Sequence, residues 1–378
     1  MAFYDALARS LEALGQAGCR RALPQVPPGL VNLSSNDYLG LLEDAELRER
    51  FYAQLSGEDR LLSAASSRLL TGNSEAVQRL ETALARAYGA EAALVFGSGY
   101  HANTGILPAL AGPKSLVLAD KLIHASMIDG IRAAGCKFFR FRHNDLAHAR
   151  TLLERHAADF DEVFVMTESV FSMDGDCVDL PGLVALKRDF PNVVLYLDEA
   201  HGVGVFGQTG LGCAHEAGLA GEIDLLVGTC GKAWSSTGAY VICREVVRDA
   251  LVNRTRPFIF TTALPPINLA WTRFVLEAFP AMAERRRRVR EMGRRLTEAI
   301  AARGIACPSA SQIVPLVIGS NEAAIAAAAR FRQAGFYVLP IRPPTVPDGT
   351  ARLRFSLTAA VDDEAFARLL ALVSEGEA

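Results

Sequence analysis

The sequence predicts an α/β protein with a mostly parallel central sheet, followed by a smaller α+β C-terminal domain. Short β-type runs alternate with helical stretches from residue 90 onward, and this alternation is typical of strands covered by helices. The runs are apolar at nearly every position, which indicates strands buried on both faces. They are AALVF (92–96), SLVL (115–118), KFFRF (137–141), EVFVM (162–166), VVLYL (193–197), IDLLV (223–227) and AYVIC (239–243).

Two helices are expected before this region. Residues 1–18 form an amphipathic pattern, and a loop rich in Pro and Gly follows them. Residues 74–88 repeat a helical stripe, with Ser74 as the expected N-cap and Gly89 as the expected stop.

The pattern changes again near residues 257–268, where three prolines bracket FIFTTAL. A long helical region interrupted at Pro280 follows, then IVPLVI, an Ala-rich helix (322–334), FYVL, a Pro-rich loop, ARLRFSL and a last helix. We therefore expect an N-terminal helix and arm over residues 1–40, a large α/β domain over 41–267 and a small α+β domain over 268–378.

The composition excludes several classes of protein. Of 378 residues, 50% are apolar and 21% are charged, as in ordinary globular proteins. The net charge of −3 argues against a nucleic-acid or anionic-membrane partner. No apolar stretch reaches the roughly 18 residues of a spanning helix, and the N-terminus lacks the pattern of a signal peptide. The seven scattered cysteines contain no CxxC, so we expect reduced thiols, no metal site and a cytoplasmic location.

The run Arg285 to Arg288 is the one charge block. It is either the solvated face of a helix or a contact for an anionic ligand such as a CoA phosphate.

The segment LYLDEAHGVGVFG (195–207) allows three interpretations. DEAH after an apolar strand resembles a helicase motif, but that chemistry requires an upstream GxxxxGK[ST], which the chain lacks. Gly202, Gly204 and Gly207 fit the dinucleotide fingerprint by spacing, but polar residues separate them from the strand and no helix follows. In the third interpretation Asp198 and His201 carry chemistry at the carboxyl edge of the sheet, where α/β proteins bind ligands.

Lys232 is one of only five lysines and lies among small and apolar residues in GTCGKAWSSTG. A partly desolvated lysine supplies a neutral amine that attacks carbonyls. Together with Asp198 it implies pyridoxal phosphate (PLP), which needs a lysine and an acid facing its ring nitrogen. FGSGYHANTG (96–105) fits a phosphate site at a helix start, Thr229 could add a hydroxyl and His124 could stack on the ring.

Eight motifs in order resemble the α-oxoamine synthases, PLP enzymes of the aspartate-aminotransferase fold (fold type I). They are SSNDYLGL, FGSGYHAN, HASMIDG, ESVFSMDGD, DEAHGVG, GTCGKA, FTTALPP and RPPTVPDGTARLRFSLT. The resemblance covers nearly the whole chain. The segment between Arg21 and Ser34 is shorter than is usual in the family.

The resemblance implies a cofactor role for each matching residue. Lys232 forms the Schiff base, Asp198 pairs with the ring nitrogen and His124 stacks on the ring. His201 and Ser172 contact the phenolic oxygen. The phosphate is bound by backbone N–H groups of Gly99 and Tyr100, by Thr229 and, in the partner subunit, by Thr261 or Thr262.

The resemblance also implies the substrates. Arg354 holds the amino-acid carboxylate with Asn36 nearby, while Arg20, or alternatively Arg21, and Thr345 face the acyl thioester. The implied reaction is decarboxylative condensation of L-alanine with pimeloyl-CoA, or pimeloyl-ACP, to 8-amino-7-oxononanoate, CoA and CO2 in biotin biosynthesis, by a homodimer. The alternatives are 5-aminolevulinate synthase and glycine C-acetyltransferase activity, and a plain aminotransferase.

Overall fold

The structure is a computed structural model that describes residues 2–21 and 23–375. The chain divides into two compact units, which we describe separately. The large unit contains residues 39–171 and 177–287. The second unit contains the N-terminal residues up to Tyr38, the short segment Ser172–Asp176 and the chain from Arg288 onward.

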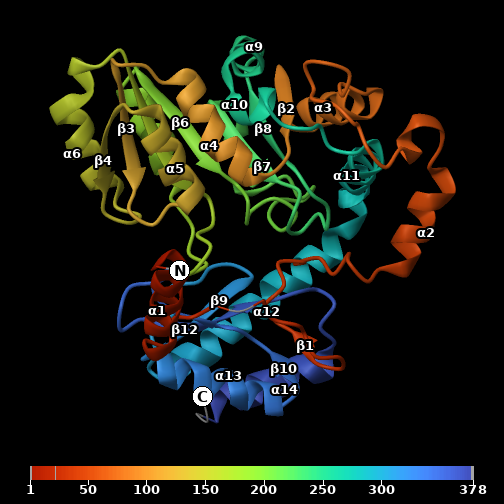
Figure 1. Ribbon diagram of the computed structural model, residues 1–378, viewed down its shortest axis with the longest axis vertical. Coiled ribbons are helices and arrows are strands. Elements are labelled where there is room, and N and C mark those ends of the chain that lie inside the picture. The colour runs from red at the N-terminus through yellow and green to blue at the C-terminus, as the bar shows by residue number, and fades with distance from the viewer. Residues whose placement is uncertain (1, 22, 376–378) are drawn as a thin grey trace. The chain divides into compact units, whose positions relative to one another are not determined.

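A seven-stranded sheet forms the centre of the large unit (Figure 1). Its order is β2-β8-β7-β6-β5-β3-β4, and only β8 runs antiparallel to its neighbours. The strands are β2 (Ala92–Phe96), β3 (Ser115–Asp120), β4 (Lys137–Phe141), β5 (Glu162–Glu168), β6 (Val193–Asp198), β7 (Leu225–Thr229) and β8 (Ala239–Cys243). All seven predicted strands are confirmed, although β7 begins two residues later than the apolar run.

The expectation that every strand is buried on both faces is wrong for β4. This strand lies at the edge of the sheet, and four of its five residues are exposed or half-buried. An edge strand has a neighbour on one side only, so the apolar run KFFRF is covered incompletely.

Helices cover the sheet as the alternation predicts. The helices of the large unit are α2 (Ala45–Gln54), α3 (Glu75–Tyr88), α4 (Gly99–Leu110), α5 (Ala125–Ala134), α6 (Leu146–His156), α7 (Leu180–Asp189), α8 (Cys213–Glu216), α9 (Glu245–Arg254), α10 (Arg256–Ile259) and α11 (Pro266–Ala278). Helix α3 ends where the sequence predicts, because Gly89 adopts a left-handed conformation with φ of 62°. Ser74 occupies its N-cap position, but its hydroxyl makes no capping bond.

The main core of the large unit lies between the sheet and helices α4 and α5, which pack side by side (Figure 1). Leu94, Val117, Phe164 and Tyr196 of the strands meet Ile106 and Met127 of the helices there. Each is at most 3% exposed. This packing fixes where helix α4 begins relative to the strand ends.

The second unit combines small sheets with helices. Strands β9 (Ile313–Gly319), β11 (Pro340–Ile341) and β12 (Ala351–Ser356) form an antiparallel sheet in the order β11-β12-β9. Strand β1 (Val31–Asn32) pairs in parallel with β10 (Phe336–Tyr337). The helices are α1 (Ala2–Gln16), α13 (Asn321–Gln333) and α14 (Asp363–Ser374), together with the part of α12 (Ala283–Ala302) that follows Arg287.

The arginine block at the start of α12 is occupied by contacts within the chain. Arg285 pairs with Asp44, and buried Arg286 donates to the carbonyl oxygens of Phe279 and Gln208. Arg288 donates to the carbonyl of Val361. A solvated face therefore describes only Arg287, whose side chain is 74% exposed.

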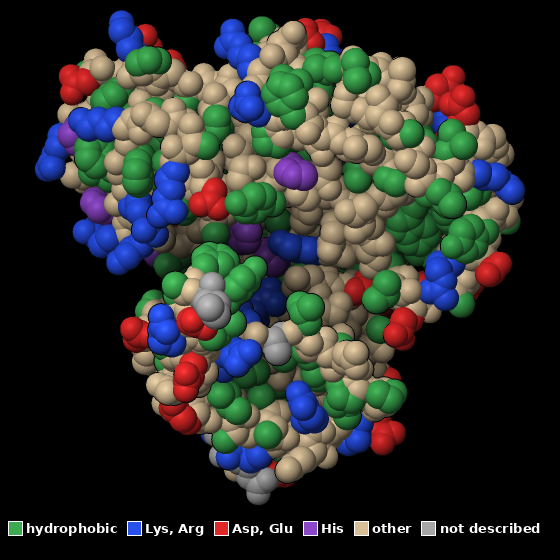
Figure 2. Space-filling model, viewed as in Figure 1, with side chains coloured by type: hydrophobic (Ala, Val, Ile, Leu, Met, Phe, Trp, Pro, Cys, Tyr) green, Lys and Arg blue, Asp and Glu red, His purple; other side chains and the backbone are tan. Residues whose placement is uncertain are grey.

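The described residues contain no helix long and apolar enough to cross a membrane. Acidic and basic side chains are interspersed over the visible face of each unit (Figure 2). The seven cysteines are free thiols.

The close approach of α4 and α5 depends on Gly130. A Cβ at this position would lie 2.2 Å from the carbonyl oxygen of Asn103. We expect Gly130→Ala to lower the free energy of unfolding by about 1–3 kcal/mol, because backbone cannot yield as a side chain does. Chemical denaturation of this variant would be compared with Gly112→Ala, where a Cβ meets no atom within 4 Å. Equal stability of the two variants would contradict the prediction.

Candidate functional site

The carboxyl edge of the large sheet gathers polar residues. Strands β5 and β6 are parallel and in register, so their last residues, Glu168 and Asp198, lie side by side. Thr229 ends the next strand, β7. The carboxyl edge of such a sheet is where α/β proteins bind ligands.

Asp198 is held in one orientation by hydrogen bonds. It is 5% exposed, and its Oδ2 accepts a bond of 2.7 Å from Nδ2 of Asn103. Its Oδ1 accepts a bond of 2.8 Å from the backbone N–H of Ala200. Asn103 is itself fixed, since its Oδ1 accepts from the Tyr196 hydroxyl at 2.8 Å. The carboxylate is therefore buried without rotational freedom, which is a costly arrangement unless its oxygens are satisfied.

Lys232 lies on a tight turn between β7 and β8. The turn is closed by bonds from Ser235 N to the Lys232 carbonyl and from Ser236 N to the Cys230 carbonyl, both 2.9 Å. The Nζ of Lys232 lies 2.8 Å from Nε2 of His201, within hydrogen-bond distance. The Lys232 side chain is half-buried and His201 is 4% exposed, so the pair is largely shielded from water.

His124 lies at the N-cap of α5, beside the same cluster. Its backbone N–H donates to Oε1 of Glu168 at 2.6 Å, and its Nδ1 is 2.7 Å from the hydroxyl of Ser126. Burial lowers the pKa of His124; Lys232 lowers it further, whereas Asp198 opposes the shift. Because both residues act on one imidazole, Lys232, Asp198 and His124 belong to a single electrostatic cluster.

Glu168 is the second acid of this cluster, and it is 2% exposed. Burial raises the pKa of its carboxyl well above the usual range, and the neighbouring Asp198 adds to that increase. Lys232 and the bond from His124 oppose the increase. Glu168 and Asp198 therefore have different hydrogen-bond partners although they end adjacent strands. Glu168 accepts from the His124 backbone, whereas Asp198 accepts from Asn103 and Ala200.

Helix α4 begins next to Thr229. A Cβ at Gly99 would lie 3.7 Å from Oγ1 of Thr229. Gly99 and Tyr100 are the first residues of the helix, and the backbone N–H groups of a first helical turn lack partners within the helix. Such a helix start attracts anions. The Tyr100 side chain points elsewhere and donates to Asp129 at 2.9 Å.

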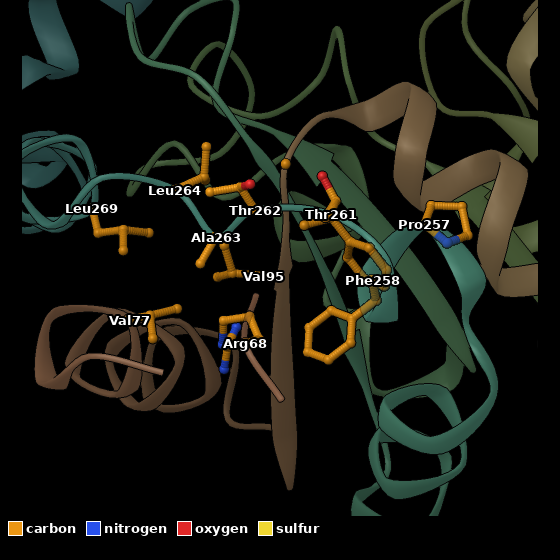
Figure 3. A pocket seen from close by; sticks show the side chains of 12 residues that line it. Arg68, Val77, Val95, Pro257, Phe258, Thr261, Thr262, Ala263, Leu264 and Leu269 are labelled. Atoms are coloured by element: carbon orange, nitrogen blue, oxygen red, sulfur yellow. The ribbon is translucent and has the colours of Figure 1, made fainter. Parts of the chain in front are cut away.

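Thr261 and Thr262 follow helix α10 and line a small cavity with Arg68, Gly97 and Phe258 (Figure 3). Its volume of about 20 Å³ suits a water molecule. Thr261 is half-buried and Thr262 is exposed.

The second unit brings together Arg354, Asn36 and Ser172. Arg354 is 8% exposed on β12, and its Nε donates to the Ser172 carbonyl at 2.5 Å. Its two Nη atoms lie 3.2 and 3.3 Å from Oδ1 of Asn36. Tyr38 lies beside the guanidinium; burial raises the pKa of its hydroxyl, and the charge of Arg354 opposes the increase.

The exposed Arg21 donates to the hydroxyl of Thr345 at 2.9 Å. The side chain of Arg20 is also exposed. Of the two arginines that the sequence leaves open, the structure thus brings Arg21 to Thr345.

Sequence reasoning missed three residues that hold this site in place, namely Asn103, Glu168 and Tyr196. Asn103 lies inside the Gly-rich motif, and Glu168 follows an apolar run directly. Tyr196 precedes Asp198 by two residues, so the two share a face of β6. A search for polar residues at strand ends could have found Glu168. Asn103 could not be found in this way, because the residue that its side-chain amide binds depends on the tertiary fold.

Comparison with known proteins agrees with this architecture. The model of the family "Aminotransferase class I and II" matches residues 28–373. A "Putative 8-amino-7-oxononanoate synthase" of Pasteurella multocida (strain Pm70) is 52% identical over 347 residues, which are 92% of this chain and 90% of that protein.

Two solved structures extend the comparison. A serine palmitoyltransferase (SPT) with a PLP internal aldimine has a TM-score of 0.88 at 29% identity, covering 99% of this chain and 97% of its own. The 8-amino-7-oxononanoate synthase from Francisella tularensis has a TM-score of 0.77 at 25% identity, covering 92% of this chain and 98% of its own. These matches confirm the fold that the motifs imply, the aspartate-aminotransferase-like fold type I. The chain belongs to the aminotransferase class I and II family.

Proposed function

We propose that this protein condenses L-alanine with the pimeloyl thioester of CoA or of an acyl carrier protein. Carbon dioxide and the free thiol are released, and the product is 8-amino-7-oxononanoate, for biotin biosynthesis. One observation carries the proposal: the amine of Lys232 lies 2.8 Å from His201, which follows the fixed Asp198 by three residues, in a chain 52% identical to a protein bearing that synthase name. The enzyme class, a PLP-dependent transferase, follows from the family and its neighbours.

The cofactor is pyridoxal phosphate, and the residues of the large unit fit it. The half-buried amine of Lys232 can bond to its aldehyde. The buried carboxylate of Asp198 can pair with the ring nitrogen, since Asn103 and Ala200 fix it in place. When bound, the cofactor supplies an electron sink that stabilises negative charge on the α-carbon of the amino acid.

The phosphate and ring contacts come from the surrounding elements. The start of α4 would bind the phosphate through the N–H groups of Gly99 and Tyr100, and Thr229 lies beside that helix start. His124 would stack on the ring, with Ser172 and His201 at the phenolic oxygen. Thr261 or Thr262 would serve the phosphate in the partner subunit of a homodimer, and the exposure of Thr262 supports this role.

Lys232 would also move the proton of the reaction. Its Nζ would accept the proton from the α-carbon of alanine and later return one to the product. His201 supports this role, because its Nε2 lies 2.8 Å from Nζ and limits the positions of a flexible side chain. A positioned base typically contributes about 10²–10⁴ in rate.

Arg354 would bind the carboxylate of alanine. Oδ1 of Asn36 lies 3.2 and 3.3 Å from the two Nη atoms, a position from which a carboxylate oxygen could accept hydrogen bonds from the guanidinium. A substrate carboxylate would replace that oxygen, and the Asn36 amide could then donate to it. Thr345, with Arg21 or Arg20, would face the acyl thioester. We place the enzyme in the cytoplasm, with no nucleic-acid or membrane partner.

Lys232→Ala should abolish turnover, because it removes both the anchor of the cofactor and the base. Borohydride reduction of the wild type, followed by peptide mass spectrometry, should find the cofactor on Lys232. Lys121→Ala, which changes an exposed lysine, should retain full activity. Turnover by cofactor-loaded Lys232→Ala would refute the assignment.

A panel of substrate pairs tests the reaction itself, with release of the free thiol as the measurement. We expect L-alanine with pimeloyl-CoA or pimeloyl-ACP to react fastest. Glycine with succinyl-CoA or acetyl-CoA tests the alternatives that the motifs leave open, and serine with palmitoyl-CoA tests the likeness to serine palmitoyltransferase. Faster thiol release with any of these three pairs would overturn the choice of substrate, and amino-group exchange without thiol release would indicate an aminotransferase.

Asn103→Ala should weaken cofactor binding, because it frees the Asp198 carboxylate to rotate. It should also lower the free energy of unfolding by about 1–3 kcal/mol, since it leaves buried oxygens without a partner. Asn192→Ala is the matched control, because the Asn192 side chain also makes hydrogen bonds in the large unit, two of them to carbonyl oxygens. Cofactor retention after dialysis would be measured for both, and equal retention would contradict the role of Asn103.

A further inference from the structure

The segment Ser172–Asp176 leaves the large unit and returns to it. Its base is closed in the large unit by a bridge between Val170 and Cys177, and by a bond of 3.2 Å from Val178 N to the Ser169 carbonyl. The segment itself belongs to the second unit. Ser172, which we propose as a cofactor contact, is therefore held by residues of the second unit.

Two arginines of β12 hold this segment. Arg352 and Arg354 are two positions apart on a strand, so they share one face. Arg354 donates to the Ser172 carbonyl, and Arg352 forms an ion pair with Asp174, also two positions on. The spacing of the arginines along the strand thus matches the spacing of their partners along the segment.

Gly175 fits the segment closely against β9. Its amino-acid type is dictated by a φ of 70° and by space, because a Cβ would lie 1.9 Å from the Ile313 carbonyl oxygen. The N–H of Ala310 donates to the Gly175 carbonyl at 3.0 Å. The backbone of the segment therefore lies directly against β9, with no space for a side chain at position 175.

The ion pair is shielded from solvent. The Arg352 side chain is 7% exposed and that of Asp174 is 22% exposed. The Nε of Arg352 is also occupied, donating to the Thr350 carbonyl at 3.0 Å. Such a pair is screened little by salt, and removal of one partner leaves a buried charge without compensation.

We propose that Asp174 and Arg352 are positioning residues that hold the segment Ser172–Asp176 on β12. Their ion pair fixes the distance between Ser172 and Arg354, which otherwise meet through one hydrogen bond from the Arg354 side chain to the Ser172 carbonyl. Ser172, the proposed cofactor contact, and Arg354, the proposed carboxylate site, are then held at a fixed distance from each other. This inference rests on the proposed function, in which Ser172 contacts the cofactor and Arg354 holds the amino acid.

The test compares Asp174→Asn, Arg352→Gln and the double variant, each as cofactor-loaded full-length protein. L-alanine is titrated, and the change in cofactor absorbance gives its dissociation constant. We expect each single variant to bind L-alanine about tenfold more weakly, the size of effect expected when one charged hydrogen bond is lost. The double variant should bind L-alanine no more weakly than the single variant with the lower affinity, because both changes remove the same interaction.

Arg288→Gln is the matched control. Arg288 is also part-buried in the second unit and pairs with Asp363, but it does not contact the segment. It should leave L-alanine binding unchanged. Equal weakening by Arg288→Gln, or additive losses in the double variant, would overturn the proposal.

Hydrogen exchange at the Ala310 amide provides a readout that needs no substrate. Asp174→Asn should accelerate this exchange about tenfold, because the bond to the Gly175 carbonyl opens more often. Unchanged exchange would overturn the proposal.

If wild-type protein fails to bind L-alanine, the proposed substrate is wrong, while hydrogen exchange at Ala310 alone still decides the positioning role. If Arg352→Gln fails to fold, Arg352→Lys and Asp174→Asn replace the comparison, with lysine expected to restore part of the affinity.

Discussion

Burial of the Asp198 carboxylate is the constraint around which the large unit is organised. A carboxylate at this depth needs donors for its oxygens, because its desolvation costs several kcal/mol. The strand end supplies one donor, the Ala200 N–H, and helix α4 supplies the other through Asn103. Helix α5 packs against the backbone of Asn103, where Gly130 leaves room for the contact. The position of a single carboxylate thus depends on the packing of two helices on the sheet.

Glu199 and Glu168, the acidic neighbours of Asp198, have different hydrogen-bond partners. Glu199 accepts bonds from the Ser169 hydroxyl and from two backbone N–H groups of residues 213–214, and burial raises its pKa. Glu168 accepts a bond from the His124 backbone, and its pKa is raised well above the usual range. Raised values mean that the two glutamates hold their protons to higher pH than free carboxyls do, which limits the negative charge buried at this edge.

The sequence was sufficient to predict the seven strands of the large sheet and the end of helix α3, because apolar runs and the glycine stop are local signals. Position within the sheet is not local, and so the exposed edge strand β4 looked like a central strand. Asn103, which holds the site in place, was missed for the same reason. Asn103 and Asp198 are 95 residues apart, and the sequence around a helical asparagine does not indicate which distant residue its amide binds. The contacts of the arginine block at the start of α12 likewise depend on the tertiary fold, because the arginines bind distant carbonyl oxygens and Asp44.

The strand β12 shows how one short sequence serves packing and chemistry together. Leu353 and Phe355 are fully buried, while Arg352, Arg354 and Ser356 alternate with them. Since neighbouring side chains of a strand point to opposite faces, the apolar pair packs into the core of the second unit and the polar residues share the other face. An insertion of one residue would exchange the two faces, so the core and the arginines could not both be kept. The alternation of RLRFS therefore ties the fold of the second unit to the placement of Ser172, whose carbonyl oxygen accepts a hydrogen bond from Arg354.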